Sequence, residues 1–510
     1  MALSGGGERK AVRQPGRDRL PTTPGLHGPS VRTRALIGAG AVAALAVLAR
    51  AGAVGLGVSA VAVVALLAAN VLVVRRSLVV RRLGARESGP VGGPLGACWL
   101  LVTLLPLHSF VIRPTTVAVT QLGIEPLIEL SYFLVVGAYA VIVIARHERG
   151  LDGSRPPVLL LALPVWTIAT AAWGPYGPYA FARGLQMLML ALLAWATIAA
   201  SRGRPDVLAD AVGTYVRWLV RLAVLLVGVG LALGPIFIPA GGANLERFTW
   251  MGAHPNASGL VLACACVVAL TAPTNVLRLR SGARTAAVVV MVVALYSNHS
   301  RMSWLEVVVG ALVAFGLAGR LRPVLRWVGT PLIGMTAFAA TVFWGEQIGS
   351  YLAREGNSES LGTGNGRLQL WSVGLDALAT PFDWAFGLGY GVTRTMFLEV
   401  GPWARNAHNS LLAWLVSGGV VALLLFLAIV GTTLRDLVRA RIIRRPDGLA
   451  VVGLLVVLGV NGLAADAMAE PTMGLGGLLL LAAVGRALAA DRVERREDEG
   501  LPAERPSARR

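Results

Sequence analysis

The polar residues that could carry chemistry in this sequence fall into three short groups. They comprise Arg247, His254 and Asn256; His299, Ser300, Arg301 and Trp304; and Arg367, Trp371, His408 and Asn409. Guanidinium groups suit phosphate because their planar fork donates two parallel hydrogen bonds and stays charged at any working pH. Three such arginines, with no aspartate-rich metal cage beside them, predict a metal-free clamp for a diphosphate. We assign Arg301 and Arg367 the main part in this clamp and Arg247 a supporting one.

A histidine adds a second chemical element to the third group. Imidazole has a reference pKa of ~6.5 and can take a proton from an attacking hydroxyl at neutral pH, which arginine cannot do. We predict that His408 is this base and that His254 and His299 orient neighbouring groups. The alternative for His408 is a purely structural place beside Asn409 at a helix cap.

The composition places these groups in a membrane protein. The chain has 510 residues, of which 55% are hydrophobic and only 14% charged, and this excludes a soluble protein. The net charge of +19 does not indicate nucleic-acid binding, because the basic residues, all arginine except Lys10, fall mostly in tails and short gaps between apolar runs. The three cysteines lie inside apolar runs and predict neither a disulfide nor a metal site.

Apolar runs separated by short arginine-bearing gaps predict an all-α polytopic fold with about fourteen transmembrane helices. The predicted spans are 35–49, 53–74, 95–112, 125–145, 157–174, 179–200, 214–237, 257–274, 284–299, 303–319, 327–345, 408–431, 449–467 and 471–488. The first span is short and follows a basic region, as in a secretory signal. Because another apolar run begins at once, an uncleaved hairpin is the favoured interpretation.

The distribution of basic residues predicts the orientation of the spans. If the N-terminal tail is cytoplasmic, 35 basic residues fall on that side and nine on the other. Basic residues near span ends favour the cytoplasm, so both termini are predicted to be cytoplasmic. The groups with Arg247, Arg301, Arg367 and His408 then lie at the extracytoplasmic face of the membrane.

One long hydrophilic stretch, 346–407, is predicted to be an extracytoplasmic loop. Within it, residues 367–379 have helical spacing and a predicted apolar face of Leu368, Trp371, Leu375 and Leu378, as in a short amphipathic helix at the membrane surface. This helix could instead merely plug the mouth of the bundle. The aromatic residues of the loop could anchor it at the interface or stack on sugars.

The glycine-rich run 387–391 in this loop lacks the strand, helix and lysine of a nucleotide-binding loop. We interpret it as a flexible turn.

These features divide the chain into five regions. The predicted boundaries are 1–34 for a disordered basic tail, 35–237 for an N-terminal membrane bundle, 238–431 for the catalytic region with its loop 346–407, 432–489 for the C-terminal membrane helices and 490–510 for a second disordered tail.

Arg301 gives the clearest indication of the ligand. A tight turn between two apolar helices holds its guanidinium near the headgroup level, where an unpaired cation is costly. The arginine could anchor the protein by reaching to lipid phosphate. Together with Arg247 and Arg367, it predicts instead a lipid diphosphate whose polyprenyl tail enters a groove between spans.

The sequence resembles the O-antigen ligase and polymerase superfamily of polytopic bacterial membrane glycosyltransferases over roughly residues 240–430. The similarity is carried by Arg247 with His254-Pro255-Asn256, by Arg301-x-x-x-Leu305, by Gly366-Arg367 with Trp371, by Gly387-x-Gly389-x-Gly391, and by His408-Asn409 with Gly419. The resemblance implies transfer of a glycan from a polyprenyl diphosphate to an acceptor hydroxyl outside the cytoplasm, with the matching arginines on the diphosphate and His408 at the position of the family's histidine.

The partners implied are the lipid-linked glycan donor, a hydroxyl-bearing glycan, lipid or wall acceptor, and membrane lipids. No cofactor and no nucleic acid is expected. Ligase and polymerase remain open, because both use the same donor chemistry and differ in the acceptor.

Two other functions compete with this one. A transporter or lipid-linked glycan flippase would use charges inside the spans, for which Glu306 and Asp466 are the best candidates. A metal-dependent polyprenyl-phosphate glycosyltransferase would need an acid in the first external loop, and the loop around Arg50 has none.

Overall fold

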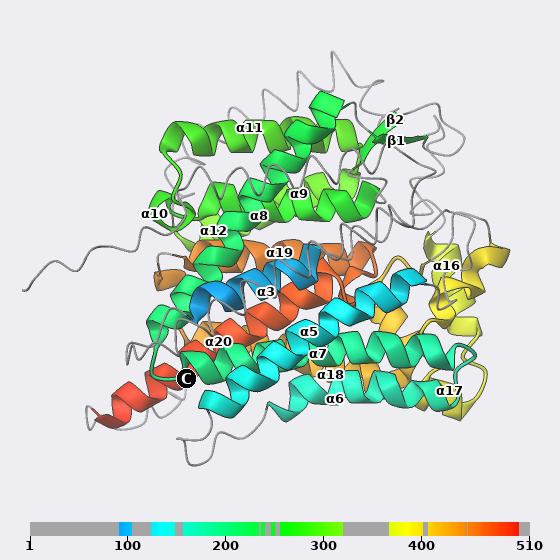
Figure 1. The fold of residues 1–510 in the computed structure, drawn as a ribbon. Coiled ribbons are helices and arrows are strands. Elements are labelled where there is room, and N and C mark those ends of the chain that lie inside the picture. Colours follow the sequence, from blue (N-terminus) through cyan, green and yellow to red (C-terminus); the bar gives the residue numbers. More distant parts are fainter. Residues whose placement is uncertain are drawn as a thin grey trace, which may run out of the picture.

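The computed structural model describes residues 91–104, 124–147, 157–233, 236–239, 246–249, 255–319, 367–400, 406–445 and 447–498. These residues form a bundle of helices with one short two-stranded sheet (Figure 1). The helices are α3 (Gly92–Leu104), α5 (Ile124–His147), α6 (Val158–Ala169), α7 (Gly177–Ser201), α8 (Pro205–Leu233), α9 (Pro255–Thr271), α10 (Thr274–Leu277), α11 (Ser281–Asn298), α12 (Arg301–Leu317), α16 (Arg367–Asp376), α17 (Pro381–Phe386), α18 (Ser410–Arg439), α19 (Gly448–Ala464) and α20 (Met473–Asp498).

Among the described residues, six helices are long and apolar enough to cross a membrane, and four further apolar helices are shorter. Every predicted span that falls in the described residues coincides, at least in part, with a helix. The spans predicted at 35–49, 53–74 and 327–345 lie outside the described residues. A helical membrane fold is therefore confirmed, and the total of fourteen spans and their orientation stay predictions.

The structure differs from the sequence prediction at three places. The span predicted at 214–237 ends as α8 at Leu233, and β1 (Ile236–Pro239) pairs antiparallel with β2 (Glu246–Thr249). Helix α20 runs to Asp498, so the first part of the tail predicted to be disordered is helical. The buried residues of α16 are Leu370 and Gly374, whereas Leu368 and Leu375 of the predicted apolar face are exposed.

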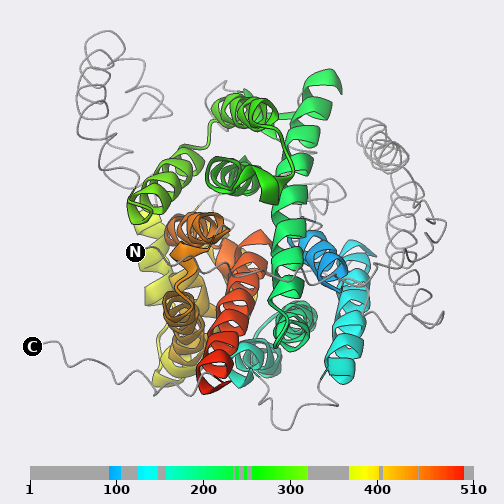
Figure 2. The same ribbon diagram turned by 90° about the vertical axis from the view of Figure 1, so that its left-hand side faces the viewer.

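Helix α20 lies at the centre of the bundle: 83% of its span is buried, against 28% for α11. It packs against α7, α18, α19 and α3. Figure 2 shows α8 running across the bundle between α3 on one side and α9 on the other, and α8 contacts both.

Helix α18 is broken at Gly419, whose φ of 69° and ψ of −170° are not helical. The glycine-rich run 387–391 fills the break: the backbone N–H of Leu388 donates to the Val416 carbonyl at 2.8 Å, and that of Gly389 donates to the Ser417 carbonyl at 3.0 Å. The interpretation of this run as a flexible turn is therefore wrong in one respect, because hydrogen bonds to α18 fix the turn in place.

We expect the Gly419→Ala variant to be strongly destabilised. This φ and ψ combination is available essentially only to glycine, and a Cβ atom at Gly419 would also collide with the Ala385 carbonyl oxygen. The expected loss in the free energy of unfolding is roughly 2–4 kcal/mol, measured by thermal unfolding in detergent. Gly431→Ala in the same helix is the control, because a Cβ there meets nothing within 4 Å. Equal melting temperatures for the two variants would contradict the proposed strain.

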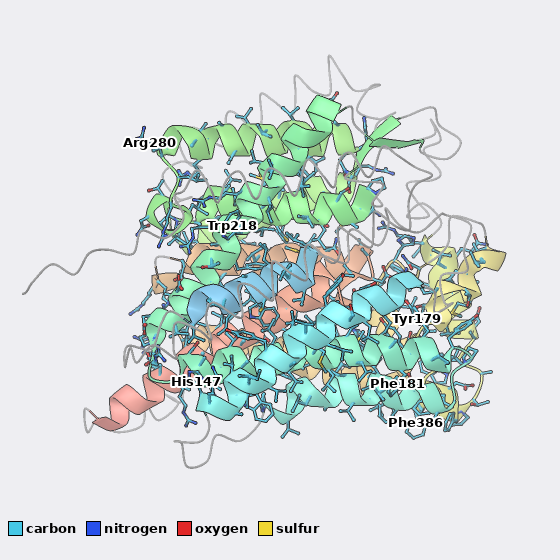
Figure 3. The ribbon with its side chains drawn as sticks, in the orientation of Figure 1. His147, Tyr179, Phe181, Trp218, Arg280 and Phe386 are labelled. Atoms are coloured by element: carbon cyan, nitrogen blue, oxygen red, sulfur yellow. The ribbon has the colours of Figure 1, made fainter. Side chains whose placement is uncertain are left out.

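The bundle has two distinct ends. Figure 3 shows His147 and Arg280 toward one end, and Tyr179 and Phe386 toward the other. The sheet and helices α16 and α17 lie at the second end, which we call the sheet end (Figure 1).

Candidate active site

Four helices that carry predicted site residues begin at the sheet end: α9, α12, α16 and α18 (Figure 1). Strand β2 contacts both α9 and α11, and α12 follows α11 after a turn of two residues. Helix α16 packs against α18. Because the N-terminus of a helix carries a partial positive charge, this end of the bundle favours anions.

The turn between α11 and α12 is held rigidly against α9. Ser300 is the N-cap of α12, and its hydroxyl accepts from the backbone N–H of Ser303. Asn298 Nδ2 donates to Ser258 Oγ in the first turn of α9 at 3.1 Å. His299 takes a left-handed conformation with φ 51°, and its ring lies beside that of Tyr296. The start of α9, which contains Asn256, is thus held next to the turn that contains His299 and Ser300.

Arg301 and Arg367 are the first residues of α12 and α16, and both are half-buried. A cation is unfavourable at a helix N-terminus, so neither arginine stabilises its own helix through the dipole. Each instead adds a full charge to the partial charge of the helix end. This combination is suited to binding an anion.

The segment that carries His408 is held between α16 and α18. Trp371 Nε1 of α16 donates to the Ala407 carbonyl at 3.1 Å. Asn409 is the N-cap of α18, and its Oδ1 accepts from the backbone N–H groups of Leu411 and Leu412. His408 is half-buried, with a left-handed φ of 49°. The third predicted group is therefore one packed unit.

The link between α19 and α20 supports this unit from the other side. Asn409 Nδ2 donates to the Leu463 carbonyl at 3.1 Å, and Ser410 Oγ donates to the Ala465 carbonyl at 2.9 Å. Trp414 Nε1 donates to the Met468 carbonyl at 3.3 Å. The backbone around His408 is consequently fixed by α16, α18 and α19 together.

The same link holds a buried ion pair that the sequence did not predict. Arg394 of the predicted loop contacts Glu470 Oε1 at 2.8 Å, and Tyr390 donates its hydroxyl to the Ala469 carbonyl at 2.7 Å. Burial alone would lower the pKa of Arg394, but Glu470 raises it above its usual range. Burial raises the pKa of Asp466 to about 6, Arg394 opposes this rise, and Glu470 adds to it.

A second buried pair joins α5 and α7 at the sheet end. Arg183 Nη1 lies 2.7 Å from Glu129 Oε1 and also donates to Gln186 Oε1 at 2.8 Å. The guanidinium stands over the Tyr179 ring, which stacks on Tyr390. A charged residue on each of two apolar spans is a signal that could have revealed this pair. Arg183 and Arg394 are therefore each held in a buried ion pair.

We expect the stability of the protein to depend on pH through Asp466. Its folded-state pKa of about 6 lies above the ordinary value of 3.8, so the folded state binds the proton more tightly. The contribution of Asp466 to the free energy of unfolding is then greatest below pH 4 and falls as the pH rises to 6, by at most roughly 3 kcal/mol. Asp466→Asn should flatten this fall in melting-temperature profiles. Asp376→Asn, at an exposed position in α16, should leave it unchanged. A fall of the same size in Asp466→Asn would refute the assignment.

The structure describes the remaining predicted site residues to different extents. Trp304 and Trp371 pack against the core. Only the backbone of Arg247 is described, in β2 opposite Ile238, and His254 lies outside the described residues. Among the described residues, no group of three or more His, Cys, Asp or Glu side chains could hold a metal ion. The transporter candidates are both buried, Glu306 beside Asn461 and Asp466 beside the Arg394–Glu470 pair.

Comparison with known proteins adds the family. Residues 286–427 match the family model described as O-Antigen ligase. This segment is similar to that family, and we refer to it as the O-antigen ligase domain. The match covers about a quarter of the chain, and Arg301, Arg367, His408 and Gly419 all lie within it, whereas Arg247 lies outside. No curated protein matches the chain.

The O-antigen ligase domain confirms the resemblance stated from the sequence motifs. Together with the apolar helices, it indicates a membrane protein of polysaccharide biosynthesis with a ligase-type or polymerase-type glycosyltransferase function. Within this domain the Gly419 position now has a physical explanation, since it is the point at which α18 breaks to accept the run 387–391.

Proposed function

We propose that the protein transfers a glycan from a polyprenyl-diphosphate donor to an acceptor hydroxyl on the extracytoplasmic face of a bacterial plasma membrane. One observation carries the proposal: Arg301, Arg367 and His408 lie within the O-antigen ligase domain, each at or next to the start of a helix, and these helices begin at one end of the bundle.

In this proposal the diphosphate is held by Arg301 and Arg367, with Arg247 assisting. As the bond between the anomeric carbon and the diphosphate breaks, negative charge grows on the leaving oxygen. Guanidinium groups and helix N-termini stabilise that charge, and one such donor is worth about 3–4 kcal/mol in comparable sites. Ser300 and Trp371 support the clamp by fixing the starts of α12 and the His408 segment.

His408 acts as the general base. Its imidazole takes the proton of the acceptor hydroxyl while the hydroxyl oxygen bonds to the anomeric carbon, and the polyprenyl diphosphate leaves with the bonding electron pair. A single displacement of this kind inverts the configuration at the anomeric carbon. NMR of the product linkage tests this, and a retained configuration would require a covalent intermediate instead.

The decisive experiment is transfer by the purified full-length protein in detergent or proteoliposomes. A defined lipid-linked oligosaccharide is supplied with and without a separate hydroxyl acceptor, and products are resolved by size. One new conjugate that needs the acceptor indicates a ligase, whereas a ladder of lengths without it indicates a polymerase. We expect a chelator to leave the rate unchanged, and loss of activity that a divalent metal restores would overturn the metal-independent mechanism.

The alternative is a transporter or a flippase of lipid-linked glycans. Vesicles that move the labelled donor between leaflets, while forming no new glycosidic bond with any acceptor, would support it and refute the transferase proposal.

A further inference from the structure

A buried polar pair joins α12 to α19 inside the bundle. Glu306 of α12 is 0% exposed and Asn461 of α19 is 3% exposed. Asn461 Nδ2 donates to Glu306 Oε1 at 2.7 Å. Within the part of the chain that the structure describes, the other two polar atoms of the pair, Glu306 Oε2 and Asn461 Oδ1, have no hydrogen-bond partner. The two remaining oxygens thus belong to the same pair of side chains.

One helical turn from this pair, the helix contacts are apolar. Helices α9, α12 and α19 pack closely, and a Cβ at Gly310 of α12 would meet Val457 of α19 and Val267 of α9. None of the ion pairs formed by the described residues involves Glu306. An ionised carboxylate with one neutral hydrogen-bond donor is very costly in such an environment.

A neutral carboxylic acid at Glu306 would explain both the two unpartnered oxygens and the burial of this side chain without an ion-pair partner. It carries one O–H donor in addition to its carbonyl oxygen, and an amide carries one carbonyl acceptor in addition to its N–H donors. The two groups are therefore complementary, and they can close a ring of two hydrogen bonds that leaves neither Glu306 Oε2 nor Asn461 Oδ1 unsatisfied.

We propose that Glu306 is a neutral carboxylic acid whose Oε2–H donates to Asn461 Oδ1, and that this two-bond pair is a positioning element for the active site. The functional part of this inference rests on the proposed function. Glu306 lies five residues after Arg301, or about 7.5 Å along the helix. Asn461 precedes Leu463, whose carbonyl holds the Asn409 side chain next to His408. The pair therefore connects the helix that begins with Arg301 to the helix end that supports His408.

This role predicts different outcomes for two substitutions at the same position. In Glu306→Gln the side chain stays neutral and keeps a carbonyl acceptor and an N–H donor, so the double hydrogen bond survives and transfer stays within about threefold of the wild-type rate. In Glu306→Leu both hydrogen bonds are lost and Asn461 is left unsatisfied. Because misplacement of reacting groups by about 1 Å can cost 10²-fold, we expect a loss of roughly 10-fold to 100-fold in kcat.

Infrared difference spectroscopy tests the protonation state without any reference to activity. The wild-type spectrum minus that of Glu306→Gln should contain the C=O stretch of a protonated carboxyl, and this band should shift in Asn461→Leu, which removes both partners of the acid. Asp436→Asn is the matched control. Asp436 is also buried, at 5% exposed, but contacts Arg435 and Arg486, so it should contribute only carboxylate bands.

The outcomes separate this inference from the proposed function. The absence of the protonated carboxyl band would overturn the neutral pair, whatever the activity. If the band is present and Glu306→Gln loses as much activity as Glu306→Leu, the positioning role is overturned. If wild-type protein transfers no glycan at all, the proposed function fails, and the band together with a lower melting temperature of Glu306→Leu than of Glu306→Gln still decides whether the pair exists.

Discussion

The Arg301→Ala variant should lose glycan transfer by a factor of about 10²–10³ while still inserting into the membrane and folding. This is the effect of removing one charged donor from a preorganised anion site. The helix itself should persist, because the Ser300 side chain caps α12 and the Asn298 side chain ties the turn to α9, and the variant keeps both side chains. The expected defect is thus chemical and not structural.

Initial rates with a labelled lipid-linked oligosaccharide measure this effect. Arg301→Lys keeps the charge but loses the planar fork, so its rate should lie between those of the wild type and Arg301→Ala. Arg280→Ala is the matched control, because this exposed arginine precedes α11 at the opposite end of the bundle (Figure 3). Wild-type output from Arg301→Ala would remove Arg301 from the clamp.

Sequence patterns predicted the helices well because the signal for them is local. An apolar run of membrane-spanning length leaves the backbone little choice but to satisfy its own hydrogen bonds as a helix. The predicted spans 125–145 and 179–200 accordingly lie within α5 and α7. The hairpin of β1 and β2 was missed because its strands are only four residues long, too short for a period of two to stand out.

The arrangement of the site was predictable only in part. The motifs indicated the residues, and the charge pattern indicated that they share one face. Contacts between distant residues left no signal in the sequence: Trp371 binds the backbone of Ala407, and Gly387 and Gly389 approach the break in α18. Such pairs form because tertiary packing brings together segments that no local propensity connects.

Buried polar residues show the same limit. From the sequence, the position of Glu306 in an apolar run is also compatible with a transporter. Only the fold shows that its partner is Asn461, 155 residues later in the chain. The glycine at 419 is a similar case, since a motif can mark the residue, but the collision of a Cβ with Ala385 that explains it requires the three-dimensional structure.

The His408→Asn variant should lower the rate of transfer by a factor of about 10²–10⁴, the usual contribution of a positioned general base. Asparagine is the informative replacement because His408 has a φ of 49°, a left-handed conformation that asparagine adopts more readily than most residues. The backbone held by Trp371 and Asn409 should therefore stay in place. An alanine at this position would mix loss of the base with backbone strain.

The pH dependence of the rate distinguishes a base from a structural residue. The wild-type rate should fall as the pH is lowered and the imidazole becomes protonated, whereas the residual rate of His408→Asn should lack this fall. His147→Asn is the control, because His147 lies toward the opposite end of the bundle (Figure 3), and its Nδ1 hydrogen-bonds to the Val143 carbonyl of its own helix. If His408→Asn lost activity but kept the wild-type pH profile, another group would be the base. In that case His408 would serve the site only by shaping the start of α18.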